Sequence, residues 1–420
     1  MPQIQRQNSP ARADDLRSSF AETRALTEAL AAPLSDADAT IQSMDDASPA
    51  KWHLAHTTWF WETFLLRDHA PGYSLHDERW PFLFNSYYEA EGARIARPSR
   101  GLLSRPALDE IFDWRAHVTA AMDSVLDRPE LADLIALGIA HEQQHIELLL
   151  TDIKHALFQN PLGPAMFGGA PGPAMSAGES GAGWHEHPGG VALVGHASEG
   201  FAFDNEGPRH RVLIESFALS RRLVTNAQWS DFIADGGYRT ASLWLSDGWA
   251  WVKEQGIEAP LYWRGDEIFT HQGWHARDPQ APVTHISYYE ADAFAAWVGA
   301  RLPTEFEWEA IARGQEGVVA AHDPASGNQL DGGEAPNPQG GEALFGDCWQ
   351  FTRSAYLPYP RFAPAAGAVG EYNGKFMSGQ FVLKGASCAT VRGHSRASYR
   401  NFFYPHQRWQ FTGLRLAKDI

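Results

Sequence analysis

The sequence predicts two domains of different class: a four-helix bundle, followed by an α+β half with much irregular loop. The chain has 420 residues, enough for two domains that each bury a core. Residues 12–158 contain few glycines and repeat apolar residues with the 3.6-residue period of amphipathic helices. Beyond residue 190 the apolar runs shorten while Gly and Trp become abundant, which is typical of an α+β domain.

Four segments of the first half predict the helices of the bundle, because each repeats apolar residues at three- and four-residue spacing. They are residues 16–31, 48–68, 107–127 and 129–158. Ser48 and Pro49 predict the start of the second helix, since serine caps helix N-termini and proline suits the first turn.

Residues 159–190 are rich in Gly, Pro and Ala and predict a linker or extended arm. The bundle is therefore expected over residues 12–158 and the second domain over 191–420. Within the second domain, residues 287–300 form the one clear helical pattern.

Composition excludes several classes of function. The net charge of -17 disfavours nucleic acid as a partner, because such binding depends on clustered cations. No run of about 18 apolar residues appears that would predict a membrane span. Cys348 and Cys388 are too few for a disulfide framework, so we expect a cytoplasmic protein.

Residues 141–145 read His-Glu-Gln-Gln-His, which is the HExxH pattern of zinc peptidases. On a helix His141 and His145 project from one face about 6 Å apart, so one metal ion can reach both. Two buried histidines can also be satisfied by hydrogen bonds alone, and a third histidine is needed to favour a metal. His53 and His56 on the second helix offer it. The predicted core-facing stripe of the fourth helix contains Leu131, Leu134, Gly138, His141, His145, Leu148, Asp152 and His155.

The rest of the pattern argues against a peptidase. The positions where a metzincin needs Gly and His are Leu148 and Thr151, and no acid follows Asp152 before Glu179 to serve a gluzincin. A di-iron bundle would need a second ExxH, which residues 1–158 lack. Three histidines fit either zinc or ferrous iron, and spacing leaves that choice open.

Several ordered blocks of the chain resemble the ergothioneine-biosynthesis sulfoxide synthases, the EgtB-like family. They include "SPAKWHLAHTTWFWETFLL", "LFNSYYEAEGARIARPSRGLLSRP", "HEQQHIELLLTDIKHAL", "LPTEFEWEAIARG", "GDCWQFTRSAYLPYP" and "VLKGASCATVRGHSRASYRNFFYPHQRWQFTGLRLAKD". The resemblance implies a DinB-like four-helix bundle before a C-type-lectin-like domain related to the formylglycine-generating enzyme. It also implies a reaction that uses O2 and nonheme Fe(II) to join the sulfur of cysteine or γ-glutamylcysteine to C2 of hercynine's imidazole, giving a sulfoxide.

The resemblance implies that His56, His141 and His145 hold the iron, with His53 structural or in a supporting position. Glu147 completes the family's string, but on a helix it turns about 200° from His145 and is left out of the ligand set. Gln144 lies on the ligand side, where the resemblance gives its amide a hydrogen bond to the substrate imidazole.

Four further residues of the first half match family positions. Tyr87 and Tyr88 match a tyrosine pair near the iron, from which a phenol can give a proton or hydrogen atom to the oxidised centre. Arg94 and Arg97 match an Arg-x-x-Arg pair that binds the carboxylate of the thiol substrate, a task suited to guanidinium.

In the second domain Asn401 and Phe402 match an Asn-aromatic pair near hercynine. Phe403 departs from the family pattern, because the branch that uses γ-glutamylcysteine has Asp there. We expect Phe403 to be a buried phenyl, which cannot accept a hydrogen bond from the ammonium of a γ-glutamyl arm, so free cysteine is the expected donor.

Three alternatives stay open. A selenoneine synthase and an ovothiol-type 5-histidylcysteine sulfoxide synthase belong to the same enzyme class, and the sequence does not reveal the chalcogen or the carbon attacked. A metal-free module that binds a ligand through the lectin-like domain belongs to another class. In the main interpretation the partners are small molecules: hercynine, a thiol and O2.

Overall fold

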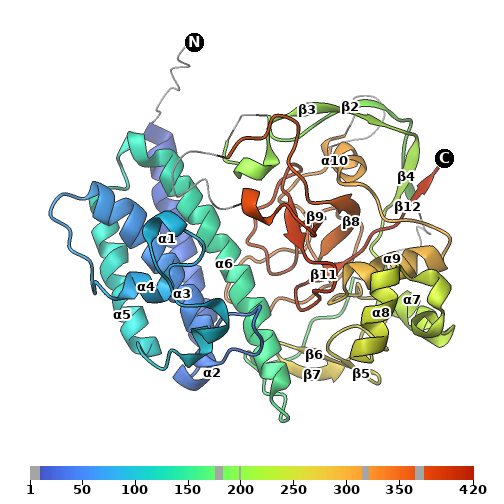
Figure 1. The fold of residues 1–420 in the computed structure, drawn as a ribbon, viewed down its shortest axis with the longest axis horizontal. Helices are drawn as coiled ribbons and strands as arrows, with labels where there is room; N and C mark the ends of the chain where they lie inside the picture. The colour runs from blue at the N-terminus through green and yellow to red at the C-terminus, as the bar shows by residue number, and fades with distance from the viewer. Residues whose placement is uncertain (1–9, 176–182, 198–199, 315–320, 365–372) are drawn as a thin grey trace. The chain divides into compact units, whose positions relative to one another are not determined.

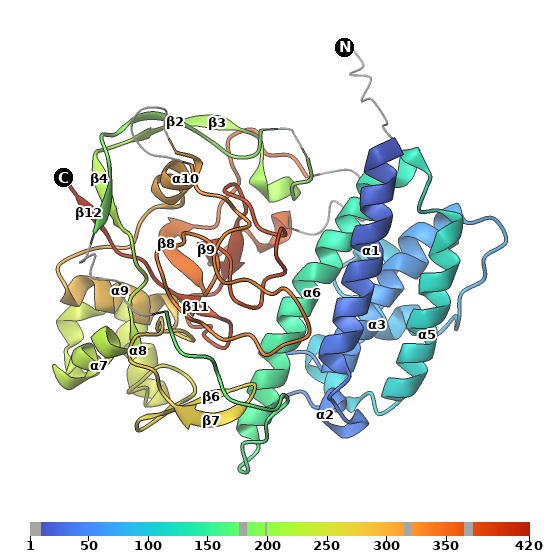
Figure 2. The same ribbon diagram turned by 180° about the vertical axis from the view of Figure 1, so that it is seen from behind.

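The computed structural model describes residues 10–175, 183–197, 200–314, 321–364 and 373–420, and Figures 1 and 2 draw it from opposite sides. The chain divides into two compact units, Met1–Ala156 and Leu157–Ile420. Residues 176–182 of the predicted linker lie outside the described residues. Strand β1 begins at Trp184, within the segment 159–190. The predicted fold class, a helical bundle followed by an α+β domain, is confirmed.

Unit 1 is built from helices in its described part, and its four long ones run side by side in both views (Figures 1 and 2). The long helices are α1 (Pro10–Ala31), α3 (Ala50–Phe60), α5 (Leu108–Ala121) and α6 (Ala132–Gln159), and the short ones are α2 (Asp36–Thr40) and α4 (Trp80–Phe84). Single 3₁₀ turns cover Glu89–Glu91, Met122–Ser124 and Pro129–Leu131, and a longer 3₁₀ helix covers Arg97–Leu102. The four predicted segments correspond to the four long helices.

Helix α3 is the centre of the bundle, since every residue from Ala50 to Phe60 is buried. A helix buried on all sides has no solvent to satisfy its polar side chains, so these need partners inside the bundle. The predicted Ser48 cap is wrong: Pro49 occupies the cap position and no side chain caps the helix. Ser48 instead donates its backbone N–H to the Asp152 carboxylate on α6 at 2.8 Å.

After Phe60 the helix continues as a π-helical segment, Trp61–Arg67, a rare form that often marks a functional region. Trp61 packs on α6 where that helix carries Gly138. A Cβ atom at Gly138 would lie 2.5 Å from the Trp61 ring, so a residue without a side chain is required there. The sequence predicted one continuous helix over 48–68 and gave no sign of the change in winding.

Unit 2 combines four small sheets with four helices in its described part. Its largest sheet has the order β10-β9-β8-β11, with β8–β9 and β9–β10 antiparallel and β8–β11 parallel. The other sheets are β1-β4-β12, β2-β3 and β5-β6-β7. The strands are β1 (Trp184–His187), β2 (Gly190–Val194), β3 (His210–Ile214), β4 (Phe217–Ser220), β5 (Trp263–Arg264), β6 (Glu267–Thr270), β7 (Gly273–Ala276), β8 (Trp349–Ala355), β9 (Phe381–Gly385), β10 (Asn401–Phe403), β11 (Thr412–Gly413) and β12 (Ala417–Asp419).

The helices of unit 2 are α7 (Asn226–Ala234), α8 (Ser246–Gln255), α9 (Tyr288–Trp297) and α10 (Glu305–Arg313). Short 3₁₀ turns cover Asp204–Glu206, Gly237–Arg239, Ala241–Leu243 and Gly374–Phe376. Helix α9 matches the predicted helix and α10 anchors a core cluster through Trp308 and Ile311. No helix among the described residues is long and apolar enough to cross a membrane.

Candidate metal centre

Three histidines from two helices meet inside the bundle. His56 comes from α3, and His141 and His145 come from one face of α6. All three side chains are buried, and one ligand nitrogen from each lies within 4.8 Å of the others. The ring centroids are 4.6 Å apart for His141 and His145, and 5.0 and 4.7 Å for His56 with each of them. The arrangement can hold one metal ion.

Burial keeps these imidazoles neutral. It lowers the pKa of His141 to about 4 and holds the pKa values of His56 and His145 well below the ordinary value, with the neighbouring histidines adding to the effect at the latter two. A neutral imidazole has one nitrogen with a lone pair, which is the form that binds a metal. Three neutral nitrogen donors suit zinc or ferrous iron, so the donor set fits the expected metal.

The orientation of His56 is fixed by its surroundings. Its Nδ1–H donates to the backbone carbonyl of Phe84 at 2.6 Å, which leaves the lone pair on Nε2. Its ring is stacked between two indoles, Trp52 at 4.6 Å and Trp59 at 5.4 Å between centroids. The stacking fixes the plane of the ring, and a ring flip would break the hydrogen bond to Phe84, so Nε2 has one direction.

His145 is held by a second histidine. The Nδ1 atoms of His145 and His53 lie 2.9 Å apart, and Nε2 of His53 lies 3.1 Å from a carboxylate oxygen of Asp152. His53 is therefore in contact with the cluster, while the three-histidine group itself contains His56.

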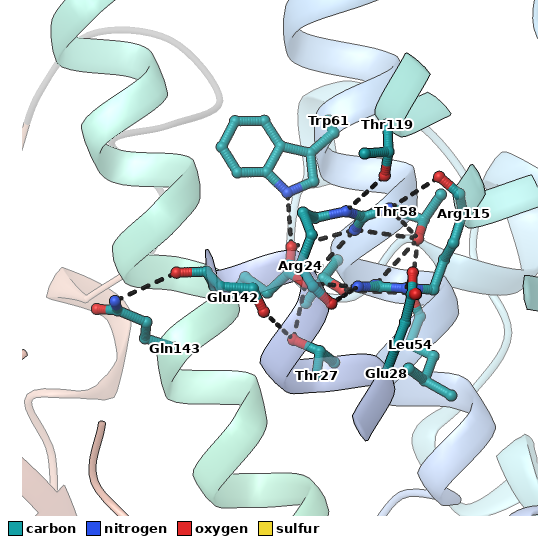
Figure 3. A network of polar contacts seen from close by, with 12 residues as sticks. Arg24, Thr27, Glu28, Leu54, Thr58, Trp61, Arg115, Thr119, Glu142 and Gln143 are labelled. Carbon is teal, nitrogen blue, oxygen red and sulfur yellow. Dashed lines mark hydrogen bonds and ion pairs between the residues drawn. The ribbon is translucent and has the colours of Figure 1, made fainter. Parts of the chain in front are cut away.

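Glu142, between the two metal-site histidines in sequence, faces a different centre (Figure 3). Its carboxylate is fully buried and both of its oxygens accept hydrogen bonds. The donors are Arg24 Nη1 at 3.1 Å, Arg115 Nη2 at 2.8 Å, Thr27 Oγ1 at 2.9 Å and Trp61 Nε1 at 2.7 Å. Burial alone would raise the pKa of Glu142, but the two guanidinium groups outweigh it and hold this pKa far below the ordinary range. A carboxylate so engaged is not the general base of an HExxH peptidase.

The tyrosine pair takes two environments. Tyr88 is buried, with its ring 5.5 Å from Trp59 and 5.2 Å from Phe64 between centroids. Tyr87 is half-buried and its hydroxyl accepts a hydrogen bond from Arg97 at 2.9 Å. Tyr88 therefore lies against the indole that stacks on His56, and Tyr87 is tied to the arginine pair.

The other predicted residues of unit 1 are less buried. Arg94 forms an ion pair with the exposed Glu89 at 2.6 Å. Gln144 and Glu147 are half-buried on α6.

Comparison with known proteins decides the family. Residues 184–420 match the model of the sulfatase-modifying factor enzyme 1-like domain, and residues 19–149 match that of the DinB superfamily. The hercynine oxygenase of Mycolicibacterium thermoresistibile is 36% identical over 412 residues, covering 89% of this chain and 88% of that protein. The hercynine oxygenase of Mycobacterium tuberculosis is 34% identical, with 92% and 94% covered.

The chain belongs to the hercynine oxygenase family. The resemblance to the ergothioneine-biosynthesis sulfoxide synthases is thereby confirmed. A more distant relative, ergothioneine biosynthesis protein 1 of Schizosaccharomyces pombe, is 27% identical over 52% of this chain and 28% of its own length.

The sequence did not single out one buried cation of the bundle, Arg100. Arg100 lies with its guanidinium carbon 3.4 Å from the centroid of the Trp52 ring and donates to Ser48 Oγ at 2.9 Å. Burial lowers the pKa of Arg100 to about 9, so the side chain still carries its charge at neutral pH. The sequence did carry a signal for Arg100, because Arg94, Arg97 and Arg100 follow one another at a spacing of three residues.

The residues predicted in unit 2 lie together on strand β10. Phe402 stacks on Tyr356 with 4.1 Å between centroids, and Asn401 accepts from the Phe402 backbone N–H at 2.9 Å. Phe403 pairs in register with Phe381 on β9. All three β10 residues are half-buried, so the description of Phe403 as a buried phenyl is corrected to a partly exposed one.

Proposed function

We propose that this chain is a nonheme iron oxygenase that forms hercynylcysteine sulfoxide from hercynine, cysteine and O2. The sulfur of cysteine becomes bonded to imidazole C2 and gains one oxygen atom, while the second oxygen leaves as water with the hydrogens of the thiol and of C2. The buried, neutral three-histidine cluster in a chain related to hercynine oxygenases supports this proposal. The same relatives favour it over the ovothiol-type, selenoneine-forming and metal-free alternatives.

The proposed iron ligands are His56, His141 and His145. Iron(II) held by three neutral imidazoles supplies O2 activation and a site for the substrate thiolate. The rings of His56 and His141 pack against Trp52, Trp59 and Phe60, which gives the proposed ligands largely apolar surroundings.

Hercynine binding is assigned to an amide and two β10 residues. Gln144 precedes His145 on α6 and is half-buried, so its amide can hydrogen-bond an imidazole without losing all contact with solvent. Asn401 and Phe402 are proposed to take part in binding hercynine, whose trimethylammonium group suits an aromatic face such as that of Phe402.

The proton or hydrogen donor is proposed to be one of Tyr87 and Tyr88. Tyr88 is a candidate because it is buried against Trp59, the indole that stacks on His56. Tyr87 is a candidate because its hydroxyl is hydrogen-bonded to Arg97, which is proposed to bind the thiol substrate. Each Tyr→Phe variant removes one hydroxyl and little volume, so the fold should survive. Product analysis should show one variant turning more cysteine into the sulfinate and less into sulfoxide, by about 10-fold or more. Unchanged products from both variants would place the donor elsewhere.

We propose free cysteine as the sulfur donor, with its carboxylate bound by Arg94 or Arg97. Phe403 offers no acceptor for the ammonium group of γ-glutamylcysteine. The measurement is kcat/KM for both thiols at saturating hercynine, for the native chain and for Phe403→Asp. Cysteine should be preferred by the native chain, and Phe403→Asp should shift the ratio toward γ-glutamylcysteine. Equal use of the two thiols by the native chain would contradict the proposal.

The function itself is tested by anaerobic reconstitution with Fe(II), metal analysis and mass spectrometry of the products. We expect about one iron per chain and a sulfoxide that depends on hercynine, cysteine and O2. His56→Ala should lose both iron and product, whereas His155→Ala, which removes a buried histidine of α6 bonded to Ser43, should keep both. A native chain that binds no iron and forms no sulfoxide would refute the function.

A further inference from the structure

The contact between His53 and His145 has a defined polarity. Their Nδ1 atoms are 2.9 Å apart, and a hydrogen bond between two imidazole nitrogens needs one N–H and one lone pair. If His145 binds a metal through Nε2, its proton is on Nδ1, and His53 must accept at its own Nδ1. The proton of His53 then lies on Nε2.

Asp152 completes this assignment. Its Oδ2 lies 3.1 Å from Nε2 of His53, and a carboxylate oxygen can only accept, which requires the N–H at that position. Asp152 also accepts the Ser48 backbone N–H at 2.8 Å, so the carboxylate is fixed at the start of α3. The same proton positions therefore satisfy both hydrogen bonds, from His145 to His53 and from His53 to Asp152. All three side chains are buried.

We propose that His53 and Asp152 are positioning residues, which hold His145 in its Nδ1–H form and direct its Nε2 toward the metal. The inference rests on the proposed metal function. At His56 the same task is performed by the backbone carbonyl of Phe84. Side chains that orient a metal-binding histidine in this way contribute about 10- to 100-fold to metal affinity.

The geometry also favours His53 as a support over a ligand. Its ring nitrogens face Asp152 and His145, and the three converging ligand nitrogens come from His56, His141 and His145. His53 lies three residues before His56 on α3, and both rings pack against His145. They differ in their second partner on α6, which is Asp152 for His53 and His141 for His56.

The test is anaerobic titration of the full-length apo-protein with Co(II), which gives both an affinity and a visible absorption spectrum that reports the ligand geometry. His53→Phe removes the acceptor and fills the space; we expect Co(II) binding to weaken about 10- to 100-fold and the absorption bands to shift. His53→Asn keeps an acceptor near the Nδ1 position and should restore part of the affinity. Asp152→Asn should weaken binding by a smaller factor.

The matched control is His155→Phe. His155 is also a buried histidine of α6, and its Nδ1 bonds Ser43 Oγ at 2.7 Å, away from the three-histidine group. Its replacement should change neither the Co(II) affinity nor the spectrum, although it removes a buried ring in the same way. A general loss of bundle stability would affect both variants alike, as thermal unfolding of the apo-proteins would reveal.

Three results would overturn the inference. One is a His53→Phe variant with the affinity and spectrum of the native chain. If that variant does not fold, Asp152→Asn decides in its place, and an unchanged affinity and spectrum contradict the proposal. The third is a His56→Ala variant that still binds Co(II) tightly, which would make His53 a ligand. A native chain that binds no Co(II) would instead refute the metal site itself.

Discussion

His141 and Glu142 are neighbours on α6, yet their side chains enter two polar centres of opposite character. His141 belongs to a cluster of neutral imidazoles, whose nitrogens converge without any charged side chain among the three. Glu142 is an ionised carboxylate between two guanidinium groups, and both of its oxygens are engaged. About 100° of helix rotation separates the two directions.

The difference shows how one bundle core can serve binding and stability separately. Converging lone pairs on neutral nitrogens are satisfied best by a cation. We call the histidine centre open because it can still bind such an ion. The Glu142 centre is closed, because donors from α1, α5 and the π-helical segment occupy both carboxylate oxygens. Substitutions in the two centres should therefore have different signatures.

The largest loss of stability is expected for Glu142→Gln. The amide keeps the shape but removes the negative charge, leaving Arg24 and Arg115 buried without compensation, apart from the weaker contact of Arg115 with the half-exposed Glu28 at 3.4 Å. Breaking a buried ion pair in this way costs about 3–5 kcal/mol. Urea unfolding of the apo-protein measures this change.

Asp123→Asn is the control for that measurement, because Asp123 also pairs with an arginine, Arg17, but on the surface of the same bundle. Exposed pairs contribute about 0–1 kcal/mol. If Glu142→Gln lost no more stability than Asp123→Asn, the description of the Glu142 centre as a structural network would be wrong.

A smaller effect is expected for Gly138→Ala, which tests how Trp61 reaches Glu142. The new methyl group would lie 2.5 Å from the indole, so Trp61 must move and its 2.7 Å hydrogen bond to Glu142 must weaken. Overpacking of this kind lowers the free energy of unfolding by about 1–3 kcal/mol. The higher helix propensity of alanine offsets part of that loss. Urea unfolding combined with Trp fluorescence would detect both changes; an unshifted fluorescence spectrum with unchanged stability would contradict the packing argument.

The comparison also shows which parts of the site a sequence can reveal. The four long helices and the paired histidines of α6 follow from local periodicity and from HxxxH spacing. The choice of His56 over His53 came from the family resemblance, because both lie on the same helix and spacing cannot separate them. The Glu142 network could not be predicted, since Arg24 and Arg115 are distant in sequence and only the packing of α1 and α5 on α6 brings them together.

The fold of unit 2 was harder to predict from the sequence, because its elements are short. Its strands are two to seven residues long, which is too short to show a clear alternation. Helices α7 and α10 did carry a local signal, the capping boxes Thr225 with Gln228 and Thr304 with Glu307. Those pairs would have predicted two helix starts that apolar periodicity missed.

His141→Leu is expected to change the stability least of these variants and to abolish metal binding. Leucine is close to histidine in volume and brings no polar atom, and the site already contacts Phe60, with 4.8 Å between the centroids of Phe60 and His141. Volume-conserving replacement by an apolar side chain changes the free energy of unfolding by less than about 1.5 kcal/mol. The apo-protein should therefore unfold at nearly the native urea concentration, while Fe(II) and Co(II) binding are lost. Glu142→Gln, in the fraction that remains folded, should still bind metal. If His141→Leu instead destabilised the bundle as strongly as Glu142→Gln, the histidines would be structural members of the core, and the separation of an open centre from a closed one would fail.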